Sequence, residues 1–425
     1  MSTEKMTVSE RLKYLRMMKK RYRKASRKEK KGLLDEMEIV TGQHRKSLIR
    51  SLNGSLERKP RSRERGVKYG PEVDDALRVI YESLDCICAE RLTPSLGWMA
   101  THLAKHGEME LTPELLEQLE QISISTVERR LCHLRQDQPR LPRKKPSPRS
   151  KRLKDIPMLR LPWNLDEPGH FETDLVHHSG PTVFGEYVHT LQMIDVATGW
   201  SERRAVLGRS YRVMRAAFRS ILAHLPFPVL QIHPDNGGEF FSDHMMRFWE
   251  NEVEGVILSR SRPYHKNDNP RIEQKNSTLV RAYLGDDRLD SVCQVVALNK
   301  LYDKMGIYYN LFQPVMHLVE KEFIPQNGSP ARIRRRHDQA QTPFQRLCQT
   351  NAILPEHREQ LCALRDSINP RLLRREIYDD LSDLFTLPGA VPGVTEDIHQ
   401  TLACYQEKFA DSLFAAAFQL TAVKA

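Results

Sequence analysis

Three acidic residues in three different settings constrain the fold of this chain more than any other feature of its sequence. Asp174 lies within residues 170–176, His-Phe-Glu-Thr-Asp-Leu-Val, whose apolar and β-branched side chains are typical of a core strand. Asp235 follows a second apolar run, residues 229–232, and stands in a Pro-Asp-Asn-Gly-Gly turn. Glu273 stands near the start of a helix that an Asn-Pro step introduces. Because an acid among apolar residues is costly unless its charge is offset, the pattern predicts that these carboxylates share a cation.

Carboxylates from two strands and a helix suit Mg²⁺ or Mn²⁺, which prefer oxygen ligands and keep waters that a phosphate can replace. Two such ions can activate an attacking oxygen and stabilise a leaving one during displacement at phosphorus. The predicted chemistry is therefore phosphodiester transfer.

The three segments resemble the RNase H-like catalytic core shared by retroviral integrases and the integrase-type transposases of bacterial insertion sequences. The likeness covers roughly residues 165–310 and continues more weakly to about 350. The 37 residues between Asp235 and Glu273 are close to the habitual gap of that family. The matching motifs are Asp-Asn-Gly-Gly-Glu-Phe at 235–240, Arg-Ile-Glu-Gln-Lys-Asn at 271–276 and the hairpin Ile-Asp-Val-Ala-Thr-Gly-Trp at 194–200.

This resemblance implies a DNA transposase, an enzyme of DNA integration and recombination in a mobile element. Asp174, Asp235 and Glu273 would be both catalytic residues and metal ligands. Two Mg²⁺ ions, or Mn²⁺ as a substitute, would be bridged by Asp174. Water would cleave at the transposon end, and the freed 3′-hydroxyl would attack target DNA. The partners would be double-stranded transposon ends and target DNA, bound by a homo-oligomer that assembles on DNA.

Other polar residues near these motifs compete for roles in the site. Glu172 should share a strand face with Asp174, so it is a candidate supporting group, and Asp195 is the other nearby acid. His177 and His178 are candidate metal or substrate contacts, but we interpret them as surface residues of the first strand.

Residues 1–57 predict a basic arm followed by a helix-turn-helix DNA-binding domain. The run 21–31 is dense in Lys and Arg, which fits either a DNA-binding arm or a solvated helix face. Apolar residues then recur at helical spacing on both sides of a Thr-Gly break: Leu33, Leu34, Met37 and Val40, then Leu48, Ile49 and Leu52. The second helix would present DNA-binding residues, namely Arg45, Lys46 and Arg50. A plain helical hairpin is the alternative.

Residues 69–136 predict a second helical domain, similar to a helix-turn-helix, that ends in another candidate recognition helix. A capping box at 125–128 would open that helix, with Arg129 and Arg130 facing out toward DNA. Residues 137–160 form a basic, proline-rich linker in which Arg143, Lys144 and Lys145 would follow a phosphate backbone. A passive spacer is the alternative for the linker.

The fold class we expect is multidomain: all-α helix-turn-helix domains, then an α/β RNase H-like core with a mixed five-stranded sheet at 161–311, then a small β/α region. The polar loop before Glu273 and the helix that carries it supply further candidate DNA contacts, namely Lys266, Lys275 and Asn276. The predicted strands are about 170–178, 186–195, 200–206, 228–234 and 255–260, and the predicted helices 211–224, 242–252, 271–284 and 291–310.

Beyond the core, residues 312–350 predict a small β module with possible DNA contacts, built on a hairpin around Asn327-Gly328. Residues 351–425 predict a helical tail, with helices near 355–368, 370–386 and 395–420. The last of these is apolar enough to pack either on a partner subunit or on its own core.

The net charge of +11 indicates a polyanionic partner, and nucleic acid fits best. Seven cysteines without a disulfide framework suggest a reducing compartment, and no long apolar run predicts a membrane span. We therefore expect a cytoplasmic, nucleoid-associated bacterial protein. The alternatives to the transposase are a catalytically silent DNA-binding regulator derived from one, and a simple RNase H-like nuclease.

Overall fold

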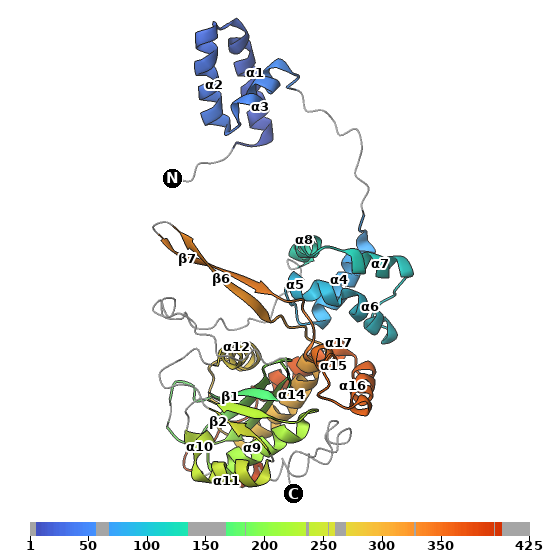
Figure 1. The fold of residues 1–425 in the computed structure, drawn as a ribbon, viewed down its shortest axis with the longest axis vertical. Coiled ribbons are helices and arrows are strands. Elements are labelled where there is room, and N and C mark those ends of the chain that lie inside the picture. Colours follow the sequence, from blue (N-terminus) through green and yellow to red (C-terminus); the bar gives the residue numbers. More distant parts are fainter. Residues whose placement is uncertain are drawn as a thin grey trace. The chain divides into compact units, whose positions relative to one another are not determined.

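The computed structural model describes residues 6–56, 68–134, 167–182, 184–234, 238–253, 255–259, 269–326, 329–394 and 396–401. The chain divides into two compact units, Met1–Lys68 and Tyr69–Ala425 (Figure 1).

The described part of the first unit holds helices α1 (Val8–Lys24), α2 (Arg27–Thr41) and α3 (Arg45–Asn53). Capping boxes open α1 and α2, and Gly42, with a φ of 66°, ends α2 in the left-handed conformation that glycine adopts without strain. The buried core consists of Leu15, Met18, Leu34, Met37, Leu48, Leu52 and Leu56. The predicted pair of helices is confirmed. The buried face of α2 runs through Met37 to Thr41, so Val40, although at helical spacing with the other apolar residues, is 42% exposed.

The second unit begins with a helical region. Its elements are α4 (Pro71–Ser83), α5 (Ala89–Leu92), the 3₁₀ turn η1 (Thr93–Ser95), α6 (Leu96–Lys105), α7 (Pro113–Gln121) and α8 (Ile124–Leu134). Helix α8 starts before Ser125, and the backbone N–H groups of Thr126 and Val127 donate to the carbonyl of Ser123. The predicted capping box that begins at Ser125 is therefore wrong.

A mixed five-stranded sheet follows, with the order β3-β2-β1-β4-β5. Strands β1 (His170–His177), β2 (Val188–Asp195) and β3 (Ser201–Leu207) are antiparallel, while β1, β4 (Gln231–Pro234) and β5 (Ile257–Leu258) are parallel. The predicted mixed sheet is confirmed. All residues of β2 and β3 are buried, as expected for strands covered on both faces.

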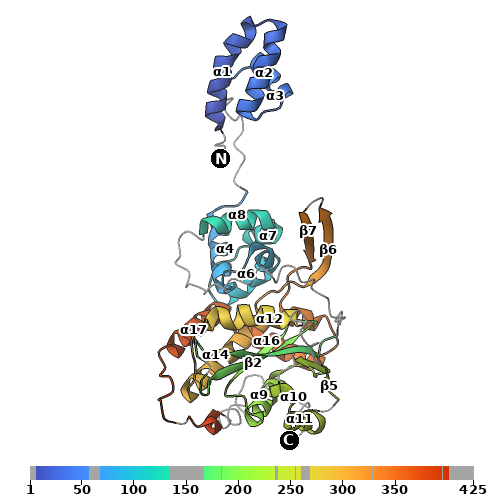
Figure 2. The same cartoon turned by 90° about the vertical axis from the view of Figure 1, so that its left-hand side faces the viewer.

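Helices cover both faces of this sheet (Figure 2). On one side lie α9 (Tyr211–His224), α10 (Gly238–Phe241) and α11 (Asp243–Glu252). On the other lies α12 (Pro270–Lys275), which continues through a π-helical segment (Asn276–Arg281) into α13 (Ala282–Leu284), and beside it α14 (Val292–Leu311). The helix predicted at 271–284 is thus interrupted by a wider turn, a feature that often marks functional sites.

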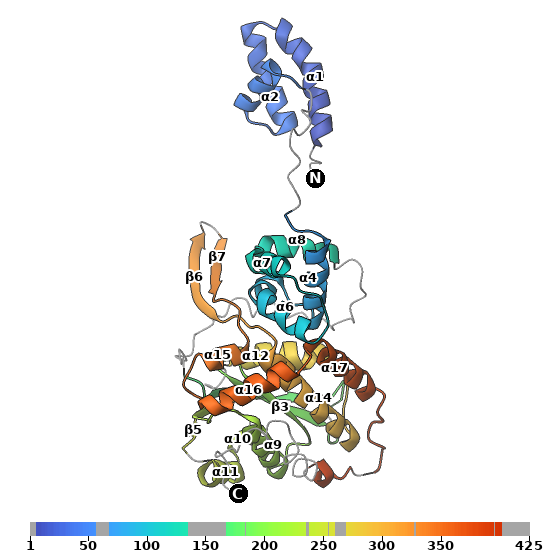
Figure 3. The ribbon, with the colours of Figure 1, turned by 90° about the vertical axis from the view of Figure 1, so that its right-hand side faces the viewer.

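After α14 the chain forms the antiparallel hairpin of β6 (Leu318–Gln326) and β7 (Ser329–His337), which confirms the predicted hairpin. Helices α15 (Pro343–Cys348), α16 (Pro355–Ser367) and α17 (Pro370–Leu384) follow. Helix α17 packs along α14, where Lys304 pairs with Glu376 and Asp380 (Figure 3). The predicted helix at 395–420 lies almost wholly outside the described residues.

The helical region and the α/β region share one hydrophobic core and several buried polar contacts. The hydroxyl of Tyr308 donates to the carbonyl of Ser83 at 2.7 Å. Asp85, in the corner after α4, accepts from the hydroxyls of Tyr283 and Tyr378 and pairs with Arg374. These contacts fix the candidate recognition helix α8 and the sheet within one compact unit.

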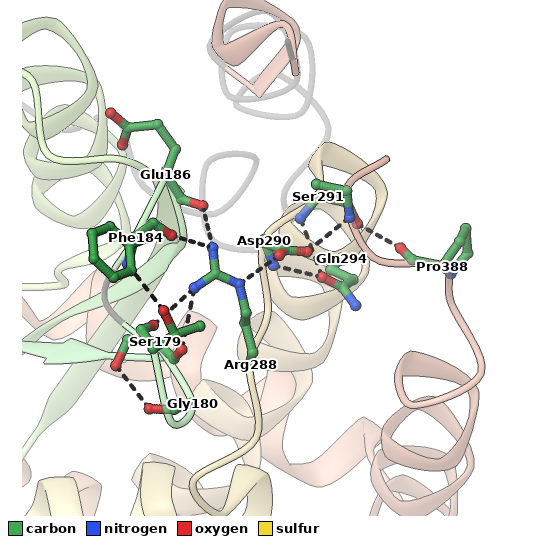
Figure 4. A network of polar contacts seen from close by, with 11 residues as sticks. Ser179, Gly180, Phe184, Glu186, Arg288, Asp290, Ser291, Gln294 and Pro388 are labelled. Carbon is green, nitrogen blue, oxygen red and sulfur yellow. Dashed lines mark hydrogen bonds and ion pairs between the residues drawn. The ribbon is translucent and has the colours of Figure 1, made fainter. Parts of the chain in front are cut away.

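A single arginine fastens the loop between β1 and β2 (Figure 4). The guanidinium of Arg288 donates to the backbone carbonyls of Ser179, Thr182, Phe184 and Glu186, and pairs with Asp290 at 2.6 Å. Arg288 thus anchors the loop that joins β1, the strand that carries Asp174, to β2.

Candidate active site

Asp174 lies in β1 with its carboxylate half-buried beneath α12. One oxygen accepts from the side-chain amide of Asn276 at 2.6 Å, and the other accepts from the backbone N–H of Leu175 at 2.8 Å. Asn276 is the first residue of the π-helical segment and only 7% exposed. The side chain predicted to contact DNA is therefore turned toward Asp174.

Glu172 holds the helix that carries Glu273. Two residues before Asp174, it shares the same strand face, and its carboxylate accepts from the backbone N–H groups of Arg271 at 3.0 Å and Ile272 at 2.8 Å. The Arg271 guanidinium adds an ion pair at 3.3 Å. Burial raises the pKa of Glu172, and Arg271 and the backbone donors oppose that rise. Glu172 thus caps α12 from β1, since the first N–H groups of a helix have no partner within it.

Of the other two acids of the predicted triad, Glu273 lies among the described residues and Asp235 does not. Glu273 follows Ile272 directly and exposes its side chain on α12. Asp235 lies outside the described residues. Strand β4 ends one residue earlier, at Pro234, which is the cross-strand partner of Thr173, the neighbour of Asp174. The fold therefore brings together β1, the end of β4 and α12, the three elements on which the acids were predicted.

Asp195 has a structural role in this fold. It is fully buried and accepts from the backbone N–H groups of Gly169 and Thr198 and from the Thr198 hydroxyl at 2.6 Å. Burial raises its pKa, and these donors counter the rise. Asp195 thus closes the turn between β2 and β3.

The two histidines after Asp174 were predicted to lie on the surface. For His178 the prediction is wrong: it is buried, its Nε2 lies 2.8 Å from the hydroxyl of Thr190, and burial lowers its pKa to about 3. His177 is half-buried, with its ring 4.8 Å from that of His189. Both rings contact side chains of β2, His178 at Thr190 and His177 at His189.

In the first unit, Lys46 and Arg50 are exposed on α3, as expected of DNA-contacting side chains. Arg45 is half-buried instead, because it pairs with Asp35 and donates to the carbonyl of Lys31. Its guanidinium joins α3 to α2.

In the second unit, Arg129 is exposed on α8 and donates to the carbonyl of Ser125 at 3.2 Å. Arg130 was also expected to face out, which is wrong. It is half-buried, pairs with Asp74 and donates to the carbonyl of Tyr69, so it fastens α8 to α4. A tertiary ion pair has turned this side chain inward.

Lys275 is half-buried, and its pKa is lowered to about 7 by burial and then by the positive charges of Arg91 and Arg203. The other predicted DNA contacts, Arg143, Lys144, Lys145 and Lys266, lie outside the described residues.

Two buried polar residues in register with Asp174 were not predicted from the sequence, namely Gln192 and Arg203. The available signal was their position inside two runs predicted to be core strands. A polar side chain in a buried strand requires a partner, whichever face it occupies.

Among the described residues, no three His, Cys, Asp or Glu side chains gather closely enough to hold a metal ion. The donors that meet beneath α12 are carboxylate and amide oxygens. The side-chain oxygen of Asn276 is buried beside Asp174 with no hydrogen-bond partner in the described part of the chain. Oxygen donors of this kind fit Mg²⁺ or Mn²⁺.

Comparison with known proteins gives a relative but no activity. The chain is 36% identical over 302 residues to the uncharacterized protein y4rM of Sinorhizobium fredii (strain NBRC 101917 / NGR234), which covers 71% of this chain and 86% of y4rM. The chain belongs to the same family as y4rM. The match to y4rM spans most of both proteins, so the two share more than one isolated segment. No family model matches the chain. Within the described ranges, no helix combines the length and apolar character needed to span a membrane.

Proposed function

We propose that this protein is an integrase-type DNA transposase with an RNase H-like core, which binds transposon ends and catalyses phosphodiester cleavage and strand transfer. One observation carries the proposal. Asp174 in the central strand is hydrogen-bonded to Asn276 at 2.6 Å, on the same helix as Glu273, while the parallel strand β4 ends beside it immediately before Asp235.

Asp174, Asp235 and Glu273 would hold two Mg²⁺ ions, with Mn²⁺ as a substitute. When bound, the ions would supply charge neutralisation at phosphorus and an activated oxygen nucleophile. Oxygen ligands from three separate elements support this assignment, since displacement at phosphorus depends chiefly on positioning and charge.

Two neighbours of the acids have defined positioning roles in this proposal. Glu172 fixes the start of α12 through two backbone N–H groups, which sets where Glu273 projects. Asn276 orients the Asp174 carboxylate from the opposite side. Both hold side chains ready before a substrate arrives, and such preorganisation is a large part of catalysis.

DNA recognition would be shared by several basic elements. Two helices present exposed basic side chains that could contact DNA: α3 presents Lys46 and Arg50, and α8 presents Arg129. Strand β7 adds the exposed Arg334 and Arg335. The excess of positive charge over the whole chain favours binding to a phosphate backbone. We propose a homo-oligomer assembled on two ends, in the bacterial cytoplasm with the nucleoid.

Strand transfer tests this function. The purified protein is incubated with Mg²⁺, supercoiled target DNA and labelled duplexes from the DNA that flanks its gene, each with a free 3′-hydroxyl. Joined products that disappear with Asp235→Asn support the transposase. Binding of the duplexes without cleavage or joining, in Mg²⁺ and in Mn²⁺, would favour the silent regulator. Cleavage without joining would favour a nuclease.

A further inference from the structure

Three polar side chains form a row across β1, β2 and β3, on the face of the sheet that α12 and α14 cover. In the pairing of β1 with β2, Asp174 is opposite Gln192, and in the pairing of β2 with β3, Gln192 is opposite Arg203. Residues opposite each other on neighbouring strands project from the same face of a sheet, with their Cβ atoms about 5 Å apart. The row therefore runs from Asp174 inward to Arg203.

The inner two members of the row are closed off from solvent and lack partners. Gln192 is 0% exposed and Arg203 is 1% exposed. Within the described part of the chain, the amide oxygen and nitrogen of Gln192 and all three guanidinium nitrogens of Arg203 have no hydrogen-bond partner. A buried polar group without a hydrogen-bond partner destabilises the fold, and a buried charged group without one does so more strongly. A ligand that accepts hydrogen bonds would satisfy the donors among these atoms, namely the Gln192 amide nitrogen and the guanidinium nitrogens of Arg203.

The surroundings of Arg203 offer its guanidinium no hydrogen-bond acceptor within the described part of the chain. Its guanidinium carbon lies 5.7 Å from the ring centroid of Tyr302 and 5.6 Å from that of Tyr309. The ring faces attract the positive charge, but they do not accept the hydrogen bonds that the guanidinium N–H groups donate in their own plane. The Tyr302 hydroxyl is 2.7 Å from the hydroxyl of Thr190. The negative charge of Glu202 acts on Arg203 without a hydrogen bond between the two, because Oε1 of Glu202 accepts from the indole of Trp200 and the side-chain amide of Asn310.

We propose that Arg203 and Gln192 bind a small monovalent anion of the size of chloride, held by the guanidinium and the Gln192 amide N–H₂. The near-complete burial of both side chains excludes a phosphodiester. Water alone would satisfy the donors but would place no negative charge within hydrogen-bond distance of the guanidinium.

This site is independent of the proposed transposase activity. A filled anion site would place a negative charge two strands from Asp174, which links the ionic composition of the solution to the stability of the sheet. Its ligand is defined by charge and size, so bromide is a suitable probe.

Diffraction from crystals of the full chain grown in sodium bromide tests the site directly. The expected result is an anomalous peak within hydrogen-bond distance of the Arg203 guanidinium and the Gln192 amide. Density there without an anomalous signal would be water and would overturn the proposal.

Thermal unfolding in chloride, measured against gluconate at constant ionic strength, gives a test in solution. The wild type and the control Arg212→Met, which removes an exposed arginine, should both be stabilised by chloride. Arg203→Met should lose that response, and Gln192→Met, which keeps the arginine, should weaken chloride binding at least 10-fold. If Arg203→Met does not fold, Gln192→Met decides the test. An equal chloride response in all folded variants would overturn the proposal.

Discussion

Removal of the Glu172 carboxylate should release the start of α12 and misplace Glu273. In Glu172→Ala, the backbone N–H groups of Arg271 and Ile272 lose their acceptor, and the Arg271 guanidinium loses its partner. Hydrogen bonds to charged groups contribute about 1.5–3 kcal/mol each, and part of this is recovered where water reaches the half-exposed Arg271. We therefore expect a loss of about 2–4 kcal/mol in the free energy of unfolding.

The variant Glu172→Gln separates the hydrogen bonds that cap α12 from the ion pair with Arg271. The amide oxygen can occupy the position of Oε2, which accepts both backbone N–H groups, while the amide nitrogen faces Arg271 and loses the ion pair. The glutamine variant should lose only about 1 kcal/mol. Strand transfer should fall about 10-fold or more in Glu172→Ala and recover partly in Glu172→Gln, with end binding unchanged in both.

Denaturant unfolding and strand transfer with precut ends measure these two effects. Glu359→Ala, which removes an exposed glutamate from α16, is the matched control and should behave as the wild type. The reasoning is refuted if Glu172→Ala joins strands at the wild-type rate, or if glutamine restores no more than alanine.

Three further outcomes follow from side chains elsewhere in the fold. Burial lowers the pKa of His178, His189 and His224 from 6.5 to about 3, so each neutral ring stabilises the fold fully above pH 6.5 and loses that contribution as the pH falls toward 3. The loss should approach about 1.4 kcal/mol per pH unit for each histidine, and urea unfolding at pH 7, 6 and 5 should show a shallower decline in His224→Gln than in the wild type. Leu48→Ala should destabilise the first unit by about 2–5 kcal/mol, detected as an earlier unfolding transition and weaker end binding, while an unchanged transition would show that α3 does not depend on this side chain. Arg288→Met should expose the amides of the loop between β1 and β2 to faster hydrogen exchange, and protection equal to the wild type would contradict the anchoring role of Arg288.

Most of the sheet could be predicted from the sequence because the patterns that indicate its strands and turns are local. The buried run around Asp174 and the Thr-Gly turn before β3 specify strands and a turn without reference to distant residues, and Gly199 adopts a φ of 76° as such a turn requires. The Asn-Gly step between β6 and β7 predicted their hairpin for the same reason.

Side-chain roles that depend on tertiary register could not be read in this way. Arg130 lies inward because it pairs with Asp74. Asp74 is 56 residues away along the chain, so the local sequence around Arg130 does not indicate this partner. The contact between Asn276 and Asp174 depends on how α12 is seated over β1, and the row to Arg203 depends on the pairing of three strands. Periodicity indicates which face of an element is buried, but it does not identify the residue opposite.

Cleavage of the protein backbone by bound iron tests most directly the central claim that the three acids share one metal site. Fe²⁺ replaces Mg²⁺ in the purified protein, and ascorbate with peroxide generates hydroxyl radicals that cut the chain close to the ion. Cuts near Asp174, Asp235 and Glu273 together, all suppressed by excess Mg²⁺ and by Asp174→Asn, are the predicted result. Cuts near only one of these residues, or cuts that persist in Asp174→Asn, would contradict the claim.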